Sequence, residues 1–225
     1  MITVQPIVYT SEPRRWHALA AALGLAARTP LDDMWTEFAG GGVLAIHQAE
    51  RSRQPDWHAL VDDLAATERA LADAGILFRR TELDGVGSIL HVAGTLTVSV
   101  GAGADDHGPL AVMPIWYDTD LDRARTVYRA LGLAPRISSD GGGWSDFSAD
   151  GGGLAALHGG DPRIELSFEY AGDLDALAKR VADAGFPAHI VDEAYNRTLL
   201  VDTPEGGKLW INGTIDDLYG YHAAG

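Results

Sequence analysis

Apolar and polar positions alternate along this chain with two periods, which predict short strands and amphipathic helices. Apolar stripes with helical spacing run over 121–131 and 174–181, and strand-like apolar runs cover 2–9, 57–61, 110–117 and 163–170. The pattern predicts a unit of one strand, one helix and about three strands, repeated four times along the chain. Each helical pattern ends at a glycine suited to a left-handed cap: Gly24, Gly75, Gly132 and Gly185.

The first half of the chain is repeated in the second half. The segment QPIVYTSEPRRWHALAAALGLAAR from Gln5 aligns without a gap with MPIWYDTDLDRARTVYRALGLAPR from Met113. Further on, MWTEFAGGGVLAIH (34–47) mirrors GWSDFSADGGGLAALH (143–158). Such internal similarity predicts two homologous domains, 1–103 and 110–225, joined by the Gly-, Asp- and Pro-rich segment that ends at Pro109.

Composition excludes several classes of function. A formal net charge of −15 argues against nucleic acid as a partner, and it favours a cationic small molecule unless the acidic surface serves only solubility. The chain has no cysteine, which excludes disulfides, thiolate catalysis and cysteine-bound zinc. Without a long apolar run or a signal-peptide pattern, we expect a cytoplasmic protein that does not bind membranes.

Several sequence motifs, taken in their order along the chain, resemble those of the vicinal oxygen chelate superfamily, which includes glyoxalase I, extradiol dioxygenases and bleomycin-resistance proteins. The motifs are YTSEPRRWHALAAALGL, MWTEFAGGGVLAIH, YDTDLDRARTVYRALGL, FEYAGDLDALAKRVADAGF and VDTPEGGKLWI. The resemblance implies an α+β fold of four βαβββ modules, forming two tandem glyoxalase-like domains with cup-shaped mixed sheets. In catalytic members, His, Glu or Gln from the first and last strands of modules hold a divalent metal that chelates two neighbouring substrate oxygens.

The positions that the resemblance assigns to metal ligands hold an incomplete set in this chain. Trp210 stands where metal-binding members carry Glu, and Ala45 and Ala156 have no donor atom. We therefore expect no metal cofactor. The alternative is one divalent metal held by His47 and His58, with Gln5 as the best third ligand and Glu50 as a weaker one. The assigned positions lie near Gln5, 56–58, Met113 and Glu165 on first strands, and near Ala45, 96–98, Ala156 and Trp210 on last strands.

Two histidines are equivalent in the repeat and lie near the ends of their strands. Strand alternation places His47 on the same face as the small Ala45, which leaves room inside a cup. His47 and its equivalent His158 are therefore candidates for ligand-contacting or proton-shuttling imidazoles. The alternative is a structural histidine that is hydrogen-bonded to a neighbouring loop.

Aromatic residues also recur at equivalent positions. Trp35 and Trp144 are candidates for lining a concave site, where large rings stack on a flat ligand; the alternative is that they fill the core. Trp210 replaces a family metal ligand, so it would change the site from chelation to stacking. Tyr9 and Tyr117 share strand faces with the assigned ligand positions, so we expect their hydroxyls to reach the cavity.

The segment IELSFEY places two carboxylates on one strand face. Glu165 and Glu169 share this face with Ser167, whereas Leu166 is expected on the opposite face, against the helix. Two carboxylates inside a cup would pair with a cationic ligand or take part in acid–base chemistry. The alternative is a solvated strand face with surface charges.

We therefore predict a non-metal binding protein of the bleomycin-resistance kind, which encloses a small aromatic and possibly cationic ligand. The first alternative is a metal-dependent lyase, isomerase or dioxygenase; the second is an interaction module whose cups are filled by its own side chains. Four modules can complete two cups in one chain, so a monomer or a homodimer is expected. The predicted ligand-binding residues are Tyr9, Trp35, His47, Tyr117, Trp144, His158, Glu165 and Trp210.

Overall fold

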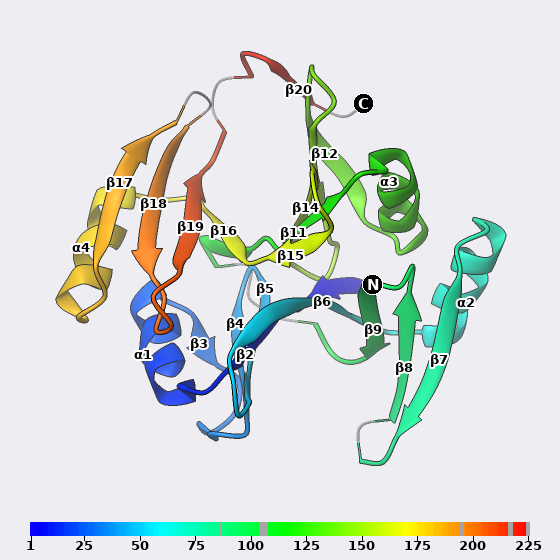
Figure 1. Ribbon diagram of the computed structural model, residues 1–225, viewed down its shortest axis with the longest axis horizontal. Coiled ribbons are helices and arrows are strands. Elements are labelled where there is room, and N and C mark those ends of the chain that lie inside the picture. Colours follow the sequence, from blue (N-terminus) through cyan, green and yellow to red (C-terminus); the bar gives the residue numbers. More distant parts are fainter. Residues whose placement is uncertain (86, 104–107, 194–195, 216–217, 224–225) are drawn as a thin grey trace.

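The computed structural model describes residues 1–85, 87–103, 108–193, 196–215 and 218–223. Its described part is an α+β structure in which four helices each accompany a set of strands (Figure 1). The first module consists of β2 (Ile7–Thr10), α1 (Pro13–Leu23), β3 (Ala26–Ala27), β4 (Trp35–Gly40) and β5 (Gly42–Gln48). The second consists of β6 (Arg53–Val61), α2 (Leu64–Asp73), β7 (Phe78–Leu83), β8 (Gly87–Val92) and β9 (Leu96–Val100), with β1 (Ile2–Val4) beside β6.

The second half repeats this plan. Its third module consists of β11 (Ile115–Asp118), α3 (Leu121–Ala130), β12 (Ala134–Ser139), β13 (Trp144–Ser148) and β14 (Leu154–Gly159). The fourth module consists of β16 (Ser167–Tyr170), α4 (Leu174–Asp183), β17 (Ala188–Asp192), β18 (Arg197–Asp202) and β19 (Lys208–Gly213). Three further strands extend its sheets: β10 (Leu110–Val112), β15 (Arg163–Glu165) and β20 (Tyr221–Ala223).

The sheets are mixed because the first and last strands of each module run parallel. In the first half the order β3-β4-β5-β2-β6-β9-β8-β7 joins both modules into one sheet. In the second half the orders are β15-β11-β14-β13-β12-β20 and β10-β16-β19-β18-β17. Within each module, the parallel pairs are β2 with β5, β6 with β9, β11 with β14, and β16 with β19. The predicted α+β fold of four βαβββ modules is confirmed.

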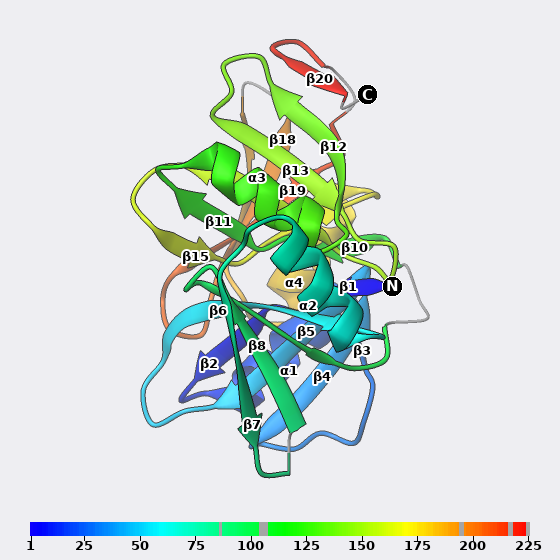
Figure 2. The same ribbon diagram turned by 90° about the vertical axis from the view of Figure 1, so that its right-hand side faces the viewer.

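The two modules of each half curve toward each other and form a cup, with the helices on the outside (Figures 1 and 2). The cups open in opposite directions, toward the top and the bottom of Figure 1. Across the halves, α1 contacts α4 and α2 contacts α3. The stacked rings of Trp57 and Tyr128, with centroids 5.4 Å apart, lie in the core where the second and third modules meet.

The apolar stripes and glycines of the sequence explain the helices. Val127 on α3 and Val181 on α4 are fully buried, as the predicted stripes require. All four predicted cap glycines adopt positive φ, for example 94° at Gly24 and 90° at Gly185. No helix of the described residues is long and apolar enough to cross a membrane.

The predictions of one continuous strand over 110–117 and over 163–170 are wrong, because each run divides into two strands that belong to different sheets. The chain leaves one sheet after Glu165 and joins the next at Ser167, because β15 pairs with β11 whereas β16 pairs with β19. Leu166 lies at this crossing between the sheets. It is therefore only partly buried and lines a cavity, whereas Phe168 is fully buried in the core.

Candidate functional site

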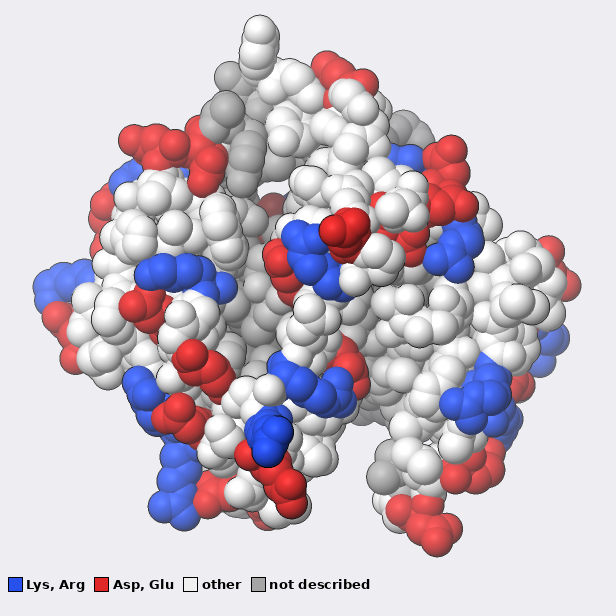
Figure 3. Space-filling view, viewed as in Figure 1, with Lys and Arg blue, Asp and Glu red and all other residues white. Residues whose placement is uncertain are grey.

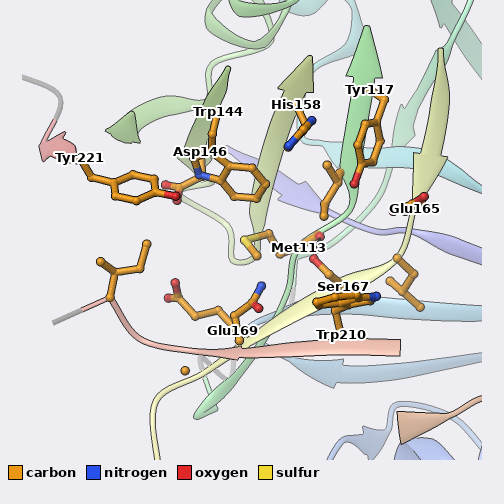
Figure 4. Close-up of a pocket in the computed structure, with 15 residues that line it drawn as sticks. Met113, Tyr117, Trp144, Asp146, His158, Glu165, Ser167, Glu169, Trp210 and Tyr221 are labelled. Atoms are coloured by element: carbon orange, nitrogen blue, oxygen red, sulfur yellow. Dashed lines mark hydrogen bonds between the residues drawn. The ribbon is translucent and has the colours of Figure 1, made fainter. Parts of the chain in front are cut away.

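A cavity of about 430 Å³ lies inside the cup of the second half, between the third and fourth modules (Figure 4). The hollow between these modules is also visible in the space-filling view (Figure 3). Strands of both modules supply its walls, and β20 adds a further residue at the mouth. The lining residues are Met113, Ile115, Tyr117, Trp144, Asp146, His158, Glu165, Leu166, Ser167, Glu169, Trp210, Asn212, Gly213, Ile215 and Tyr221.

Two tryptophans from different modules line this cavity. Leu209 and Ile211 are buried on the far face of β19, so alternation directs Trp210 into the cup, where its indole lies across the floor (Figure 4). Trp144 comes from β13 of the opposite wall. Trp144 is partly buried and Trp210 is 38% exposed, which leaves indole surface available to a ligand.

His158 lies between Tyr117 and Trp144 on the cavity wall. Its ring centroid is 4.9 Å from that of Tyr117 and 6.1 Å from that of Trp144. Its Nδ1 lies 2.7 Å from the carbonyl oxygen of Gly159. A carbonyl only accepts, so Nδ1 donates this bond, and Nε2 is the ring nitrogen left to contact a ligand.

Tyr117 is held by a charged pair at the rim of the cavity. The Arg163 guanidinium carbon lies 3.5 Å from the Tyr117 ring centroid, and Arg163 Nε donates to Glu165 Oε1 at 2.7 Å. Burial, followed by the negative charge of Glu165, raises the pKa of Tyr117 to about 12. The phenol therefore stays protonated at neutral pH, with the Glu165 carboxylate as its hydrogen-bond partner.

A partly buried guanidinium joins the two walls of the cup. Arg136 Nε donates to Asp146 Oδ1 at 2.8 Å, and its Nη1 and Nη2 donate to Glu169 at 2.8 and 2.6 Å. Asp146 is 1% and Glu169 is 9% exposed. Burial alone would lower the pKa of Arg136, but the bonds to Glu169 and Asp146 outweigh it and raise that pKa. Both carboxylates face the cavity while sharing one positive charge.

The first half contains an equivalent aromatic cluster in its own cup. The ring of His47 lies 5.2 Å from Tyr9 and 5.7 Å from Trp35, and its Nδ1 lies 2.6 Å from the Gln48 carbonyl oxygen. Arg28 pairs with Glu37 at 3.0 Å, at the repeat positions of Arg136 and Asp146.

The structure thus divides the eight predicted ligand-binding residues between the two halves. Five line the second-half cavity, and three lie together in the first half. The five are Tyr117, Trp144, His158, Glu165 and Trp210. The other three are Tyr9, Trp35 and His47.

The floor of the second-half cavity does not fit a divalent metal ion. Met113, Ser167 and Trp210 lie next to one another there. Ser167 is the strand partner of Trp210 in the β16–β19 pair, and its backbone carbonyl accepts a hydrogen bond from the Met113 N–H at 2.8 Å. The Ser167 hydroxyl donates to the Met113 carbonyl at 2.6 Å. Divalent metals of this kind prefer carboxylate oxygens or imidazole nitrogens as ligands. The floor instead presents a thioether, a hydroxyl that is donating its hydrogen, and an indole.

The alternative metal ligands in the first half are engaged with other partners. The His58 ring nitrogens lie 2.8 Å from Thr97 Oγ1 and 3.0 Å from Ser99 Oγ, and burial lowers the pKa of His58 to about 4. Gln5 adjoins His58 through a backbone bond, but its side-chain amide donates to Glu37 at 2.9 Å.

His47 lies near the end of β5, opposite Tyr9, and Glu50 is exposed. Among the described residues, no group of three His, Cys, Asp or Glu side chains is placed to hold a metal. The arrangement around His47, His58 and Gln5 therefore does not form a ready ligand set.

Sequence reasoning missed several residues of this site. Arg136 and Asp146 had a detectable signal, because the repeat carries Arg at both 28 and 136 and an acid in both WTEF and WSDF. Tyr221 had none, because it reaches the cavity only through the pairing of β20 with β12.

Comparison with solved structures identifies the fold. The 2,3-dioxygenase LapB from Pseudomonas sp. KL28 superposes with a TM-score of 0.63 at 14% identity, covering 99% of this chain and 92% of that one. Homoprotocatechuate 2,3-dioxygenase from Arthrobacter globiformis gives a TM-score of 0.61 at 15% identity, covering 99% and 80%. The Mn(II)-bound glyoxalase from Novosphingobium aromaticivorans gives 0.60 at 14% identity, covering 95% and 81%.

The chain has the vicinal oxygen chelate fold. No protein-family model matches the sequence, and no curated protein matches it either. At this low identity the comparison establishes the arrangement of the modules and not the chemistry of the cups, because one fold carries many activities.

Proposed function

We propose that this protein binds a small aromatic molecule with a positively charged group, and that it sequesters the molecule in the second-half cavity without metal chemistry. The observation that carries the proposal is the meeting of Trp144, Trp210 and the Asp146–Glu169 carboxylate pair around one cavity. Each module alone presents only part of this set. The pairing of the third and fourth modules completes it.

The cavity suits a flat ring in size and lining. Its volume of about 430 Å³ falls in the range of roughly 300–1,000 Å³ that is typical of small-molecule sites. Trp144 and Trp210 offer stacking surface from opposite modules, and Ile115 adds apolar contact. These contacts support an aromatic ligand.

The charges support a cationic group on that ligand. Asp146 and Glu169 share the single guanidinium of Arg136, which leaves one negative charge in excess beside the cavity. An ammonium group would neutralise this excess in a poorly solvated place, where the attraction is stronger than in water. The net charge of −15 would also attract such a ligand over longer distances.

Two further side chains would orient the ligand. His158 Nε2 would accept a hydrogen bond from an N–H or O–H of the ligand, and the Tyr117 ring would contact the ligand from the same wall. The expected mechanism is enclosure and slow release, with the ligand chemically unchanged.

The proposal is tested by titrating the protein with two probes of equal size, phenethylamine and the uncharged 2-phenylethanol, while tryptophan fluorescence is followed. We expect saturable binding of both, with phenethylamine at least ~5-fold tighter at low salt because only it carries the ammonium. Mass spectrometry should recover both probes unchanged. Failure of both probes to bind, or conversion of either into a product, would contradict the proposal.

A second candidate is a metal-dependent enzyme, which is favoured by the dioxygenases and the glyoxalase among the structural neighbours. Such an enzyme would require a metal near His47 and His58, and it would lose activity when His47 is replaced by alanine. An interaction module with filled cups, in contrast, would show no rise in melting temperature with any ligand.

A further inference from the structure

A second cavity lies between the halves, directly beside the one in the cup. It also has a volume of about 430 Å³, and both halves line it. Glu165, Leu166 and Trp210 line both cavities, so the two cavities adjoin at these three residues. In Figure 4 the indole of Trp210 lies at the floor of the cup.

Glu205 carries an unneutralised charge into this second cavity. Its carboxylate lies in the turn between β18 and β19 and accepts bonds from Thr10 Oγ1 at 2.5 Å, Trp16 Nε1 at 2.9 Å and Ser52 Oγ at 3.2 Å. All three donors are uncharged. In the described part of the chain, Glu205 forms no ion pair with Lys, Arg or His.

Three other charged residues that line this cavity are already paired. Arg53 binds Asp56 at 2.8 Å, Lys208 binds Asp202, and Glu165 accepts from Arg163. Their charges are therefore compensated locally. Glu205 remains as the negative charge in excess.

We propose that the cavity between the halves is a second subsite, which holds a second ammonium group of an elongated aromatic diamine against Glu205. This inference deepens the proposed function and rests on it: the ring and the first ammonium would occupy the cup, beside Glu169. The chain linking the two ammonium groups would pass Trp210, which both cavities share.

Physical chemistry favours Glu205 for this role. The neutral donors Thr10 and Trp16 are buried and fix the carboxylate without cancelling its charge, so it is oriented before a ligand arrives. Trp210 presents an aromatic face to cations on the same path. Glu205 is exposed, so its attraction to an ammonium will be screened by salt.

The test compares phenethylamine with 1,4-bis(3-aminopropyl)benzene, which carries a second ammonium on a flexible arm. In the wild-type protein at low salt we expect the diamine to bind ~10-fold more tightly, because it meets a second carboxylate. Glu205→Gln should remove this gain and leave phenethylamine binding within about twofold. Ser52→Ala is the matched control: it removes a bond to Glu205 without changing charge, and it should keep the gain.

A measurement on the unaltered protein guards against misfolding of the variant. The gain of the diamine should shrink strongly between about 20 and 500 mM NaCl, and a gain that does not change with salt would overturn the proposal. Equal binding of the two amines would also overturn it, while leaving the proposed function standing. Failure of phenethylamine itself to bind would instead overturn the proposed function.

Discussion

Arg136 Nη2 lies 2.6 Å from Glu169 Oε2, and this ion pair joins two sheets that share no strand. Arg136 belongs to β12 of the third module, and Glu169 to β16 of the fourth. The same guanidinium binds Asp146, so one side chain determines how two buried carboxylates face the cavity. Both the stability and the charge of the cup depend on it.

Arg136→Ala should destabilise the fold by about 3 kcal/mol, because it leaves two buried carboxylates without their partner. Urea unfolding at neutral pH measures this loss. The matched control is Arg28→Ala, because Arg28 is about as exposed as Arg136 but pairs with Glu37, whose side chain is 24% exposed. The loss there should be about 1 kcal/mol or less, and equal losses would contradict the special role of Arg136.

Trp210→Ala should weaken phenethylamine binding about tenfold or more, because it removes the stacking surface at the cavity floor. The melting temperature should change little, since the side chain is 38% exposed. Trp35→Ala, at the repeat position of Trp144 in the other half, should leave the affinity unchanged. If Trp35→Ala weakens binding and Trp210→Ala does not, the site lies in the first-half cup.

His58 should make the protein less stable as the pH falls below neutrality. Burial lowers the pKa of its imidazole to about 4 in the folded chain. Above about pH 6.5 both states are neutral, but at lower pH only the unfolded chain gains a proton, so stability is lost down to about pH 4. The unfolding free energy should fall by about 2 kcal/mol from about pH 7 to 5 through this group.

Urea unfolding of the wild type and of His58→Asn at both pH values separates this effect from carboxylate titration. The variant should lose less stability over this range than the wild type. Nitrogen chemical shifts should also show a neutral His58 ring in the folded protein at about pH 5. An identical pH dependence of the two proteins would contradict the buried neutral histidine.

Metal content distinguishes the binding protein from the metal enzyme. Protein exposed to Mn, Fe, Co, Ni and Zn and then dialysed should retain metal well below one ion per chain, because neither cup offers a complete ligand set. Plasma mass spectrometry measures the retained metal. The result should be the same for His47→Ala and His58→Ala. About one metal per chain that is lost in either variant would favour the enzyme.

Local patterns in the sequence were sufficient to predict the modules. Apolar stripes and cap glycines indicated the helices, and the repeat showed that His47 and His158 occupy equivalent positions. The strand break at Leu166 was missed, because nothing in IELSFEY shows that neighbouring residues join different sheets. A change of sheet depends on partners far away in the chain.

The sequence by itself determined the α+β fold, the fourfold repetition of the βαβββ module and the residue types available to a site. It could do so because helix and strand periods are local properties of the chain. Only the tertiary structure decided which of those residues meet. It brought Trp144 and Trp210 to one cavity, separated Trp35 from them, and placed Arg136 between Asp146 and Glu169. These contacts depend on how modules pair across long sequence distances, which no local pattern encodes.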